Sequence, residues 1–385
     1  MIRVSFRTTF ALLVAGIASA ACAAPPDEQE ATDAVDSDLV GGRAGAVYTL
    51  SNDVVSNDVI VFRRAANGSL QRAATYATTG KGSGDGLGSQ GAIILSTDRR
   101  WLFAVSAGSN ELSVFRVQGE ALYLVDTVPT GGVRPISVTE HDGLVYVAHA
   151  GDGKNDVRGF YQRGDGSLAA LSGSTRALSA PSVGPAQISF SPSGGALLVT
   201  EKMTNNVVEF RMGANGRPSS AMIHASAGQT PFGFAVTQRG QVVVSEAFGG
   251  ADDASAVSSY QLDRSSGLAT VAASVPSTES AACWLVLAKN DRFAYVSNTK
   301  SGTISAYSID NGGRIALIGA DGVAADTGTG SKPIDMAVSK NDRFLYVLEG
   351  GTASLGVIRV ESNGSLTVLP DVTGLPATAV GLAAQ

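Results

Sequence analysis

The stretch Leu102–Phe115, with the sequence LFAVSAGSNELSVF, decides the fold of this chain. A hydrophobic strand ends in small and polar residues, and a second strand then ends in an aromatic residue. Close copies are Leu197–Phe210 (LLVTEKMTNNVVEF) and Phe293–Tyr307 (FAYVSNTKSGTISAY). Four further copies begin near Val47, Val145, Val242 and Leu345. A repeat of about 40 to 50 residues with four short strands per unit is typical of a β-propeller blade.

The sixth repeat shows all four expected strands. Its inner strand is the short apolar run Trp284–Ala288, as expected for a strand covered on both faces. Phe293–Ser297 and Thr303–Tyr307 are the second and third strands. Asn311-Gly312 then predicts a hairpin into an outer strand over Arg314–Ile318, because Asn and Gly tolerate the positive φ of such turns.

The first repeat has no inner strand of its own, since Val47 already lies in a second strand. Pro376–Leu382 resembles the inner strand Pro333–Val338 and is followed by no further strand. We therefore expect an all-β, seven-bladed propeller over residues 46–385, with four antiparallel strands per blade. The C-terminal strand would complete the first blade and close the ring.

The N-terminal residues 1–21 read as an export signal. Arg3 and Arg7 precede an apolar stretch from Phe10 to Ala18, which is too short to remain as a membrane span. Cys22 stands where a bacterial lipoprotein signal carries its lipidated cysteine, although Ser19 replaces the usual Leu. Lipid anchoring at Cys22 and ordinary cleavage nearby both stay open. The expected location is the periplasm, the outer membrane as a lipoprotein, or the medium.

Residues 22–45 have the composition of an acidic, disordered tether. They contain few large apolar residues and carry six acidic ones, which are Asp27, Glu28, Glu30, Asp33, Asp36 and Asp38. The whole chain has a formal charge of −6 and contains no basic run, which argues against a nucleic-acid partner. Cys283, in an apolar run, is expected to be a buried small hydrophobe.

Polar residues recur at the predicted mouth of the channel. In a propeller, each second strand ends on the face where each inner strand begins. Aligning the repeats places one residue per blade there: Asn52, Ala107, His149, Glu201, Glu246, Asn298 and Glu349. Arg134 and Lys332 precede the inner strands of blades three and seven and are expected to join them. Polar groups that converge on one concave site indicate a ligand site. The alternative, which is favoured for any one of these residues alone, is a loop residue that points at water.

The chain resembles the lactonase family of propellers, which includes 6-phosphogluconolactonases of the cytosolic type and carboxymuconate-cyclising enzymes. The inner-strand entry Gly184–Gly194 (GPAQISFSPSG) and the second strand Arg343–Gly350 (RFLYVLEG) carry the resemblance, which extends over the whole repeat region. It implies a lactonase or a lactone-forming cycloisomerase if the protein is an enzyme. Export makes a phosphorylated sugar lactone an improbable substrate, because that metabolite is cytosolic.

The resemblance carries over only one of three catalytic positions. The family has a His at the entry of blade four, an Arg at the entry of blade five, and a Glu that ends the second strand of blade five. The Glu corresponds to Glu246, but Ala186 and Phe232 lie in the segments where the His and Arg would stand. Lactone chemistry needs an acid or base and a cation, so His149 is an alternative base, with Arg134 or Lys332 supplying the positive charge.

A divalent cation is another alternative. Glu201, Glu246, Asn298 and Glu349 offer the oxygen ligands that Ca²⁺ or Mg²⁺ prefers.

Three functions therefore remain open from the sequence. The first is a monomeric, exported propeller that binds a small polar ligand or cation at its mouth. The second is a hydrolase for unphosphorylated sugar lactones or γ-lactones. The third is an interaction scaffold for proteins of the cell envelope.

Overall fold

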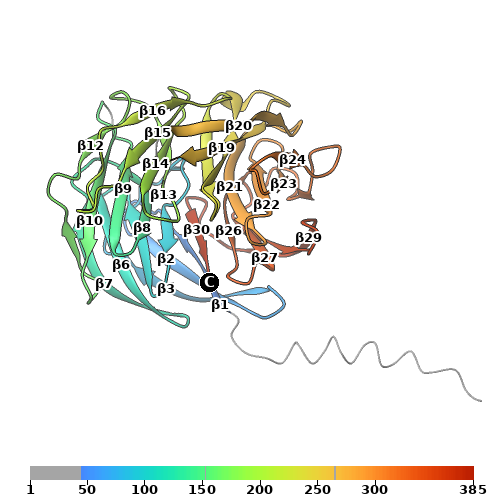
Figure 1. Ribbon diagram of the computed structural model, residues 1–385. Coiled ribbons are helices and arrows are strands. Elements are labelled where there is room, and N and C mark those ends of the chain that lie inside the picture. Colours follow the sequence, from blue (N-terminus) through green and yellow to red (C-terminus); the bar gives the residue numbers. More distant parts are fainter. Residues whose placement is uncertain (1–44, 152, 264–265) are drawn as a thin grey trace, which may run out of the picture. The chain divides into compact units, whose positions relative to one another are not determined.

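The computed structural model describes residues 45–151, 153–263 and 266–385. Seven antiparallel sheets follow one another around a ring (Figure 1). The predicted all-β, seven-bladed propeller is thus confirmed. The predicted signal 1–21, Cys22 and all of the tether except Gly45 lie outside the described residues. Among those that are described, no helix is long and apolar enough to cross a membrane.

The innermost strand of each blade lines the ring interior. In blade order, these strands are β30 (Val380–Ala384), β4 (Ile93–Leu95), β8 (Pro135–His141), β13 (Pro185–Phe190), β17 (Pro231–Val236), β21 (Ala282–Ala288) and β26 (Pro333–Val338). Four of them begin with a proline. Proline suits the first residue of a strand because its missing N–H is not needed by the ladder there.

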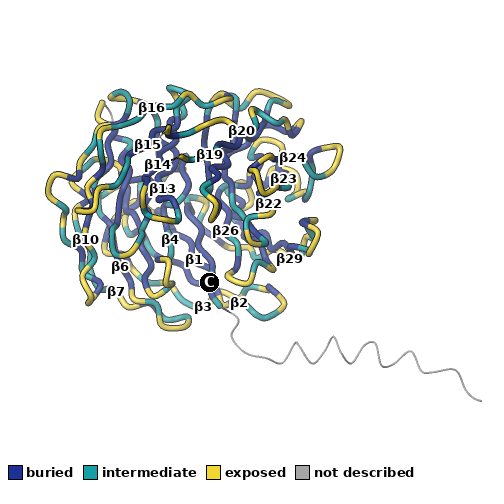
Figure 2. The backbone as a smooth tube through the Cα atoms, viewed as in Figure 1, coloured by how far each residue is buried: buried dark blue, intermediate teal, exposed yellow. Residues whose placement is uncertain are grey.

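The second and third strands form the buried middle of each blade (Figure 2). The second strands are β1 (Gly45–Leu50), β5 (Trp101–Ser106), β9 (Leu144–His149), β14 (Ala196–Glu201), β18 (Gln241–Glu246), β22 (Phe293–Asn298) and β27 (Phe344–Glu349). The third strands are β2 (Asp58–Arg64), β6 (Glu111–Gln118), β10 (Asp156–Gln162), β15 (Asn206–Arg211), β19 (Ala256–Asp263), β23 (Thr303–Ile309) and β28 (Ser354–Val360). β5 is buried at every residue, because neighbouring blades cover both of its faces.

The outer strands alternate between partly buried and exposed residues, since only one face packs against a neighbour. They are β3 (Leu70–Ala77), β7 (Ala121–Pro129), β11 (Leu168–Ala170), β16 (Met222–Ala225), β20 (Gly267–Pro276), β24 (Ile315–Leu317) and β29 (Leu366–Thr373). Blades 3 and 6 add the short strands β12 (Arg176–Ala177) and β25 (Ala325–Asp326). A 3₁₀ turn, η2 (Phe248–Gly250), follows β18.

Ring closure takes place as the sequence predicts. β1 pairs with β2 on one side and with the C-terminal β30 on the other, with Thr49 opposite Leu382. The pairing strand begins at Val380 rather than at Pro376. The described chain therefore begins and ends in the same blade.

Hairpin glycines of several blades pack against the blade before them. Gly68, in the Asn67-Gly68 turn of blade 1, has φ +90°, and a Cβ there would collide with the Phe344 ring of blade 7. The Tyr346 hydroxyl of blade 7 also donates to the Gly68 carbonyl at 3.0 Å. Gly364 packs on Phe293 in the same way. In the sixth blade the positive φ falls on Gly313, one residue after the predicted Asn311-Gly312 turn.

Candidate functional site

The side chains predicted for the channel mouth lie at the ends of the second strands, and all seven residues are buried. The face where these strands end is called the channel face below, and the opposite face the turn face. The three carboxylates are each held within their own part of the ring. Glu246 accepts hydrogen bonds from Ser258 Oγ, from Ser274 Oγ at 2.6 Å and from Gly228 N at 2.8 Å.

Glu201 and Glu349 are held in the same manner. Glu201 accepts from Ser179 N at 2.9 Å and from Thr204 Oγ1 at 2.6 Å. Glu349 accepts from Ser354 Oγ at 2.7 Å, and burial raises the pKa of its carboxyl above the ordinary value. These hydroxyl and amide donors use the oxygen atoms that a ligand or a metal ion would need.

The imidazole of His149 and the amides of Asn298 and Asn52 also have hydrogen-bond partners within the protein. His149 Nδ1 lies 2.8 Å from Asp156 Oδ1, on the adjacent strand β10. Asn298 Nδ2 donates to Ser305 Oγ at 2.8 Å. Asn52 Nδ2 donates to the carbonyl of Asp85 at 2.8 Å.

Each of these side chains therefore makes its hydrogen bonds within its own part of the ring. No two of the seven side chains bond to each other, and the described part of the chain holds no group of three or more His, Cys, Asp or Glu residues placed for a metal ion. The metal site predicted at Glu201, Glu246, Asn298 and Glu349 stays a prediction. In blades 3, 5, 6 and 7 the predicted residue bonds to a side chain of the neighbouring third strand, as His149 does to Asp156 and Glu246 does to Ser258.

Arg134 and Lys332 do lie on the channel face and are exposed. Their φ angles of +54° and +48° turn the backbone just before the inner strand. The Arg134 carbonyl accepts from Ala150 N at 2.9 Å, and the Lys332 carbonyl accepts from Gly350 N at 3.1 Å. The same backbone bond recurs in five blades, so it fixes the rim of the mouth.

Lys202, the residue directly after the second strand of blade 4, turns toward the channel. Its Nζ donates to the carbonyl of Gly88 and lies 4.9 Å from the centre of the Phe232 ring. No carboxylate pairs with Lys202 among the residues that the structure describes. Burial is the main cause that lowers the pKa of Lys202 to about 8; the Cys283 thiol opposes this shift and the charge of Arg134 adds to it. The alternation of the strand could have predicted this lysine.

The channel beneath Lys202 is crossed by the segment that connects blade 1 to blade 2. Gln90 Nε2 donates to the carbonyl of Leu285 at 2.8 Å, and Gln90 Oε1 accepts from Leu285 N at 3.1 Å. Trp284 Nε1 donates to the carbonyl of Ser89 at 2.9 Å. Ser137 Oγ donates to the carbonyl of Gln90 at 2.6 Å. The segment therefore ties blades 3 and 6, which are not neighbours, across the ring.

Two further buried groups lie on inner strands. Cys283 is a free, buried thiol beside Lys202, and burial raises its pKa to about 11. Asp335 is fully buried on β26, where its Oδ1 accepts from Met336 N at 2.8 Å. Backbone N–H groups of Gly91 and Leu382 also face this carboxyl, but burial dominates and raises its pKa to about 8.

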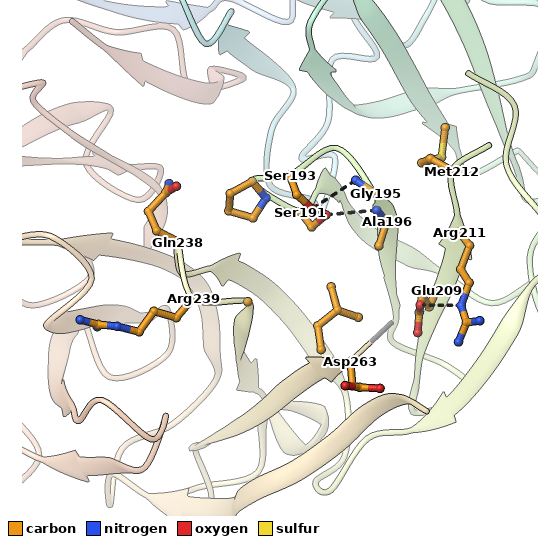
Figure 3. Close-up of a pocket in the computed structure, with 13 residues that line it drawn as sticks. Ser191, Ser193, Gly195, Ala196, Glu209, Arg211, Met212, Gln238, Arg239 and Asp263 are labelled. Carbon is orange, nitrogen blue, oxygen red and sulfur yellow. Dashed lines mark hydrogen bonds and ion pairs between the residues drawn. The ribbon is translucent and has the colours of Figure 1, made fainter. Parts of the chain in front are cut away.

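A cleft of about 540 Å³ lies on the turn face, between blades 4 and 5. Figure 3 shows Glu209 and Arg211 on one side of it and Gln238 and Arg239 on the other. The buried Glu209 is already paired, with His224 Nε2 at 3.1 Å and Arg211 Nε at 3.7 Å. None of the residues predicted for the site lines this cleft.

Comparison with known proteins places the fold in a family. The profile of the family "Lactonase, 7-bladed beta-propeller" matches residues 47–161, 155–283 and 246–378. No curated protein matches the chain.

Three similar solved structures share the fold. The Pseudomonas aeruginosa periplasmic gluconolactonase is 18% identical with a TM-score of 0.67, and the match covers 88% of this chain and 99% of that one. A candidate 6-phosphogluconolactonase from Bacteroides uniformis is 19% identical, with 88% and 99% coverage and a TM-score of 0.68. A Lactobacillus plantarum protein is 17% identical, with 89% and 100% coverage and a TM-score of 0.69. The profile match spans nearly every blade, and the chain therefore belongs to the lactonase family of seven-bladed β-propellers.

Proposed function

We propose that this propeller binds a small lactone, or the hydroxy acid formed by opening it, at the channel mouth. Lys202 would hold the carbonyl or carboxylate oxygen. The observation that carries the proposal is a half-buried ammonium group whose partner is a backbone carbonyl rather than a carboxylate. A desolvated cation gains most from an anionic oxygen, because charge-assisted hydrogen bonds are the strong ones.

Lactone hydrolysis is a second candidate, supported by the same lysine. A cation fixed at the mouth suits the oxyanion that forms when water attacks a lactone carbonyl. Glu246, the carboxylate that the family resemblance carries over, already accepts three hydrogen bonds from Ser258, Ser274 and Gly228. A base role for Glu246 would require these donors to move, so we place ligand binding before hydrolysis.

Calorimetry with D-gluconate, together with acid release from glucono-δ-lactone, tests both candidates on the purified protein. Lys202→Met should weaken gluconate binding about tenfold or more, as expected for loss of a charged hydrogen bond. Lys332→Met is the matched control on the same face and should bind within about twofold of the wild type. Unchanged binding in Lys202→Met would remove the proposal. Lactone opening that disappears in the same variant would establish hydrolysis. Sensitivity of that activity to a chelator would support a metal ion at the site.

We also propose that the protein is exported and that its ligands lie outside the inner membrane. The charged start, short apolar stretch and small residues before Cys22 support this, as does the similarity to a periplasmic gluconolactonase. Cell fractionation of the wild type and a Cys22→Ser variant tests it. Loss of membrane association in the variant alone would establish a lipid anchor, and a purely cytosolic wild type would contradict export.

A further inference from the structure

We propose that Lys202 is a reactive amine that forms an imine with a small keto acid or aldehyde acid, whose carboxylate is held by Arg134. The inference uses the same mouth as the proposed function but does not require a lactone to bind there. It follows from the surroundings of Nζ. One side of this atom faces the Phe232 ring at 4.9 Å, and the carbonyl of Gly88 accepts one of its hydrogens.

The groups that surround Nζ are themselves held in place. The Phe232 ring packs on Trp284 with 4.8 Å between ring centres. Trp284 is itself fixed by its hydrogen bond to the carbonyl of Ser89. A Cβ on Gly184 would lie 3.6 Å from Lys202 Cε, so the stem of the lysine is also confined. These contacts keep the amine desolvated and in one place.

Desolvation makes the amine a better nucleophile at neutral pH. Burial, reinforced by the charge of Arg134, lowers the pKa of Lys202 to about 8. About one molecule in ten then carries a neutral amine at pH 7, against fewer than about one in a thousand for an ordinary lysine. Cys283, the other titratable group facing Lys202, does not compete, because burial raises the pKa of this thiol to about 11.

The step balances without a redox partner. The nitrogen lone pair attacks the carbonyl carbon, and the resulting carbinolamine loses its oxygen as water. Both hydrogens of the neutral amine leave with that oxygen, and a carbon–nitrogen double bond replaces the carbon–oxygen one.

Arg134 is the reason that the proposed ligand carries a carboxylate. Its guanidinium is exposed, forms no ion pair within the described residues, and is near enough to act on the charge of Lys202. The backbone beneath it is held, since Arg134 N donates to Asn110 Oδ1 at 2.6 Å. A carbonyl compound with a carboxylate next to the reacting carbon would engage both residues at once.

Reductive trapping tests the proposal. The purified protein is incubated with glyoxylate and cyanoborohydride, and the modified lysines are mapped by mass spectrometry. Lys202 should be labelled at least about fivefold faster than Lys332, and its labelling rate should rise with pH to a midpoint near 8. Lys202→Arg keeps the charge but removes the primary amine, so its peptide should stay unlabelled while the melting temperature is unchanged. Labelling of Lys202 no faster than Lys332 would overturn the inference.

Two arms separate the parts of the proposal. Arg134→Ala should slow labelling by glyoxylate but not by glycolaldehyde, which has no carboxylate, and equal slowing of both probes would contradict the role of Arg134. Gluconate binding is measured on the same samples. Labelling of Lys202 without gluconate binding would support the imine proposal and contradict the proposed lactone site. Gluconate binding without labelling would contradict only the imine proposal.

Discussion

Asp335 is the described residue whose protonation bears most directly on the inner strands. Its carboxyl is fully buried on β26 and faces the backbone of Gly91 and Leu382, which belong to two other blades. Burial raises its pKa from 3.8 to about 8, so the folded protein holds this proton more tightly than the unfolded chain does. Its contribution to stability is complete below about pH 4 and is lost as the pH rises through about 8.

We therefore expect the unfolding free energy of the wild type to fall between pH 4 and pH 8 relative to Asp335→Asn, by up to about 1.4 kcal/mol per pH unit. The amide keeps an acceptor for Met336 N but does not titrate. Urea unfolding at pH 5 and pH 8.5 measures the difference. Parallel pH profiles for the two proteins would show that Asp335 is not the group responsible.

At this same scale, the repeat predicts where the second strands end but does not predict the direction of each side chain. Glu201 and Lys202 are neighbours, and a one-residue shift along an alternating strand exchanges the channel for the blade interior. The repeat alignment selects Glu201 because it locates the ends of the strands. It carries no information about the direction in which each side chain points. Some of the donors that hold the carboxylates come from distant segments, such as Ser179 for Glu201 and Ser274, on β20, for Glu246. No local pattern in the sequence announces those pairings.

At the scale of the element, the hairpins connect sequence and packing most closely. Asn-Gly and Asp-Gly dipeptides predict the turns, and the positive φ values at Gly68, Gly166, Gly216 and Gly364 confirm them. Their second role, as contact points for a large side chain of the preceding blade, cannot be predicted from turn chemistry. It depends on the twist that brings Phe344 over Gly68.

Gly68→Ala should therefore destabilise the protein by about 2–4 kcal/mol, from backbone strain and from the contact with Phe344. Gly119 is the matched control, because it is also a turn glycine with positive φ but has no atom within 4 Å of the position that a Cβ would occupy. Gly119→Ala should cost only about 1 kcal/mol of backbone strain. Equal losses for the two variants in thermal unfolding would mean that the contact with Phe344 carries no weight.

For the whole molecule, β30 is the strand on which closure of the ring depends. Deleting residues 380–385 should leave β1 with an unpaired inner edge and blades 1 and 7 without their shared packing. We expect this variant to lose cooperative unfolding and to associate, as measured by calorimetry and light scattering. A synthetic peptide of residues 375–385 should restore part of the transition. A monomeric variant with a wild-type transition would show that closure is dispensable.

The shared first blade also has a consequence in time. Its second, third and outer strands are the first part of the propeller to leave the ribosome, and its inner strand is the last. Six other blades are synthesised while the first one waits for its fourth strand. Any chain that stops before Val380 therefore cannot complete the blade with which it began, so finished synthesis becomes a condition of a finished fold.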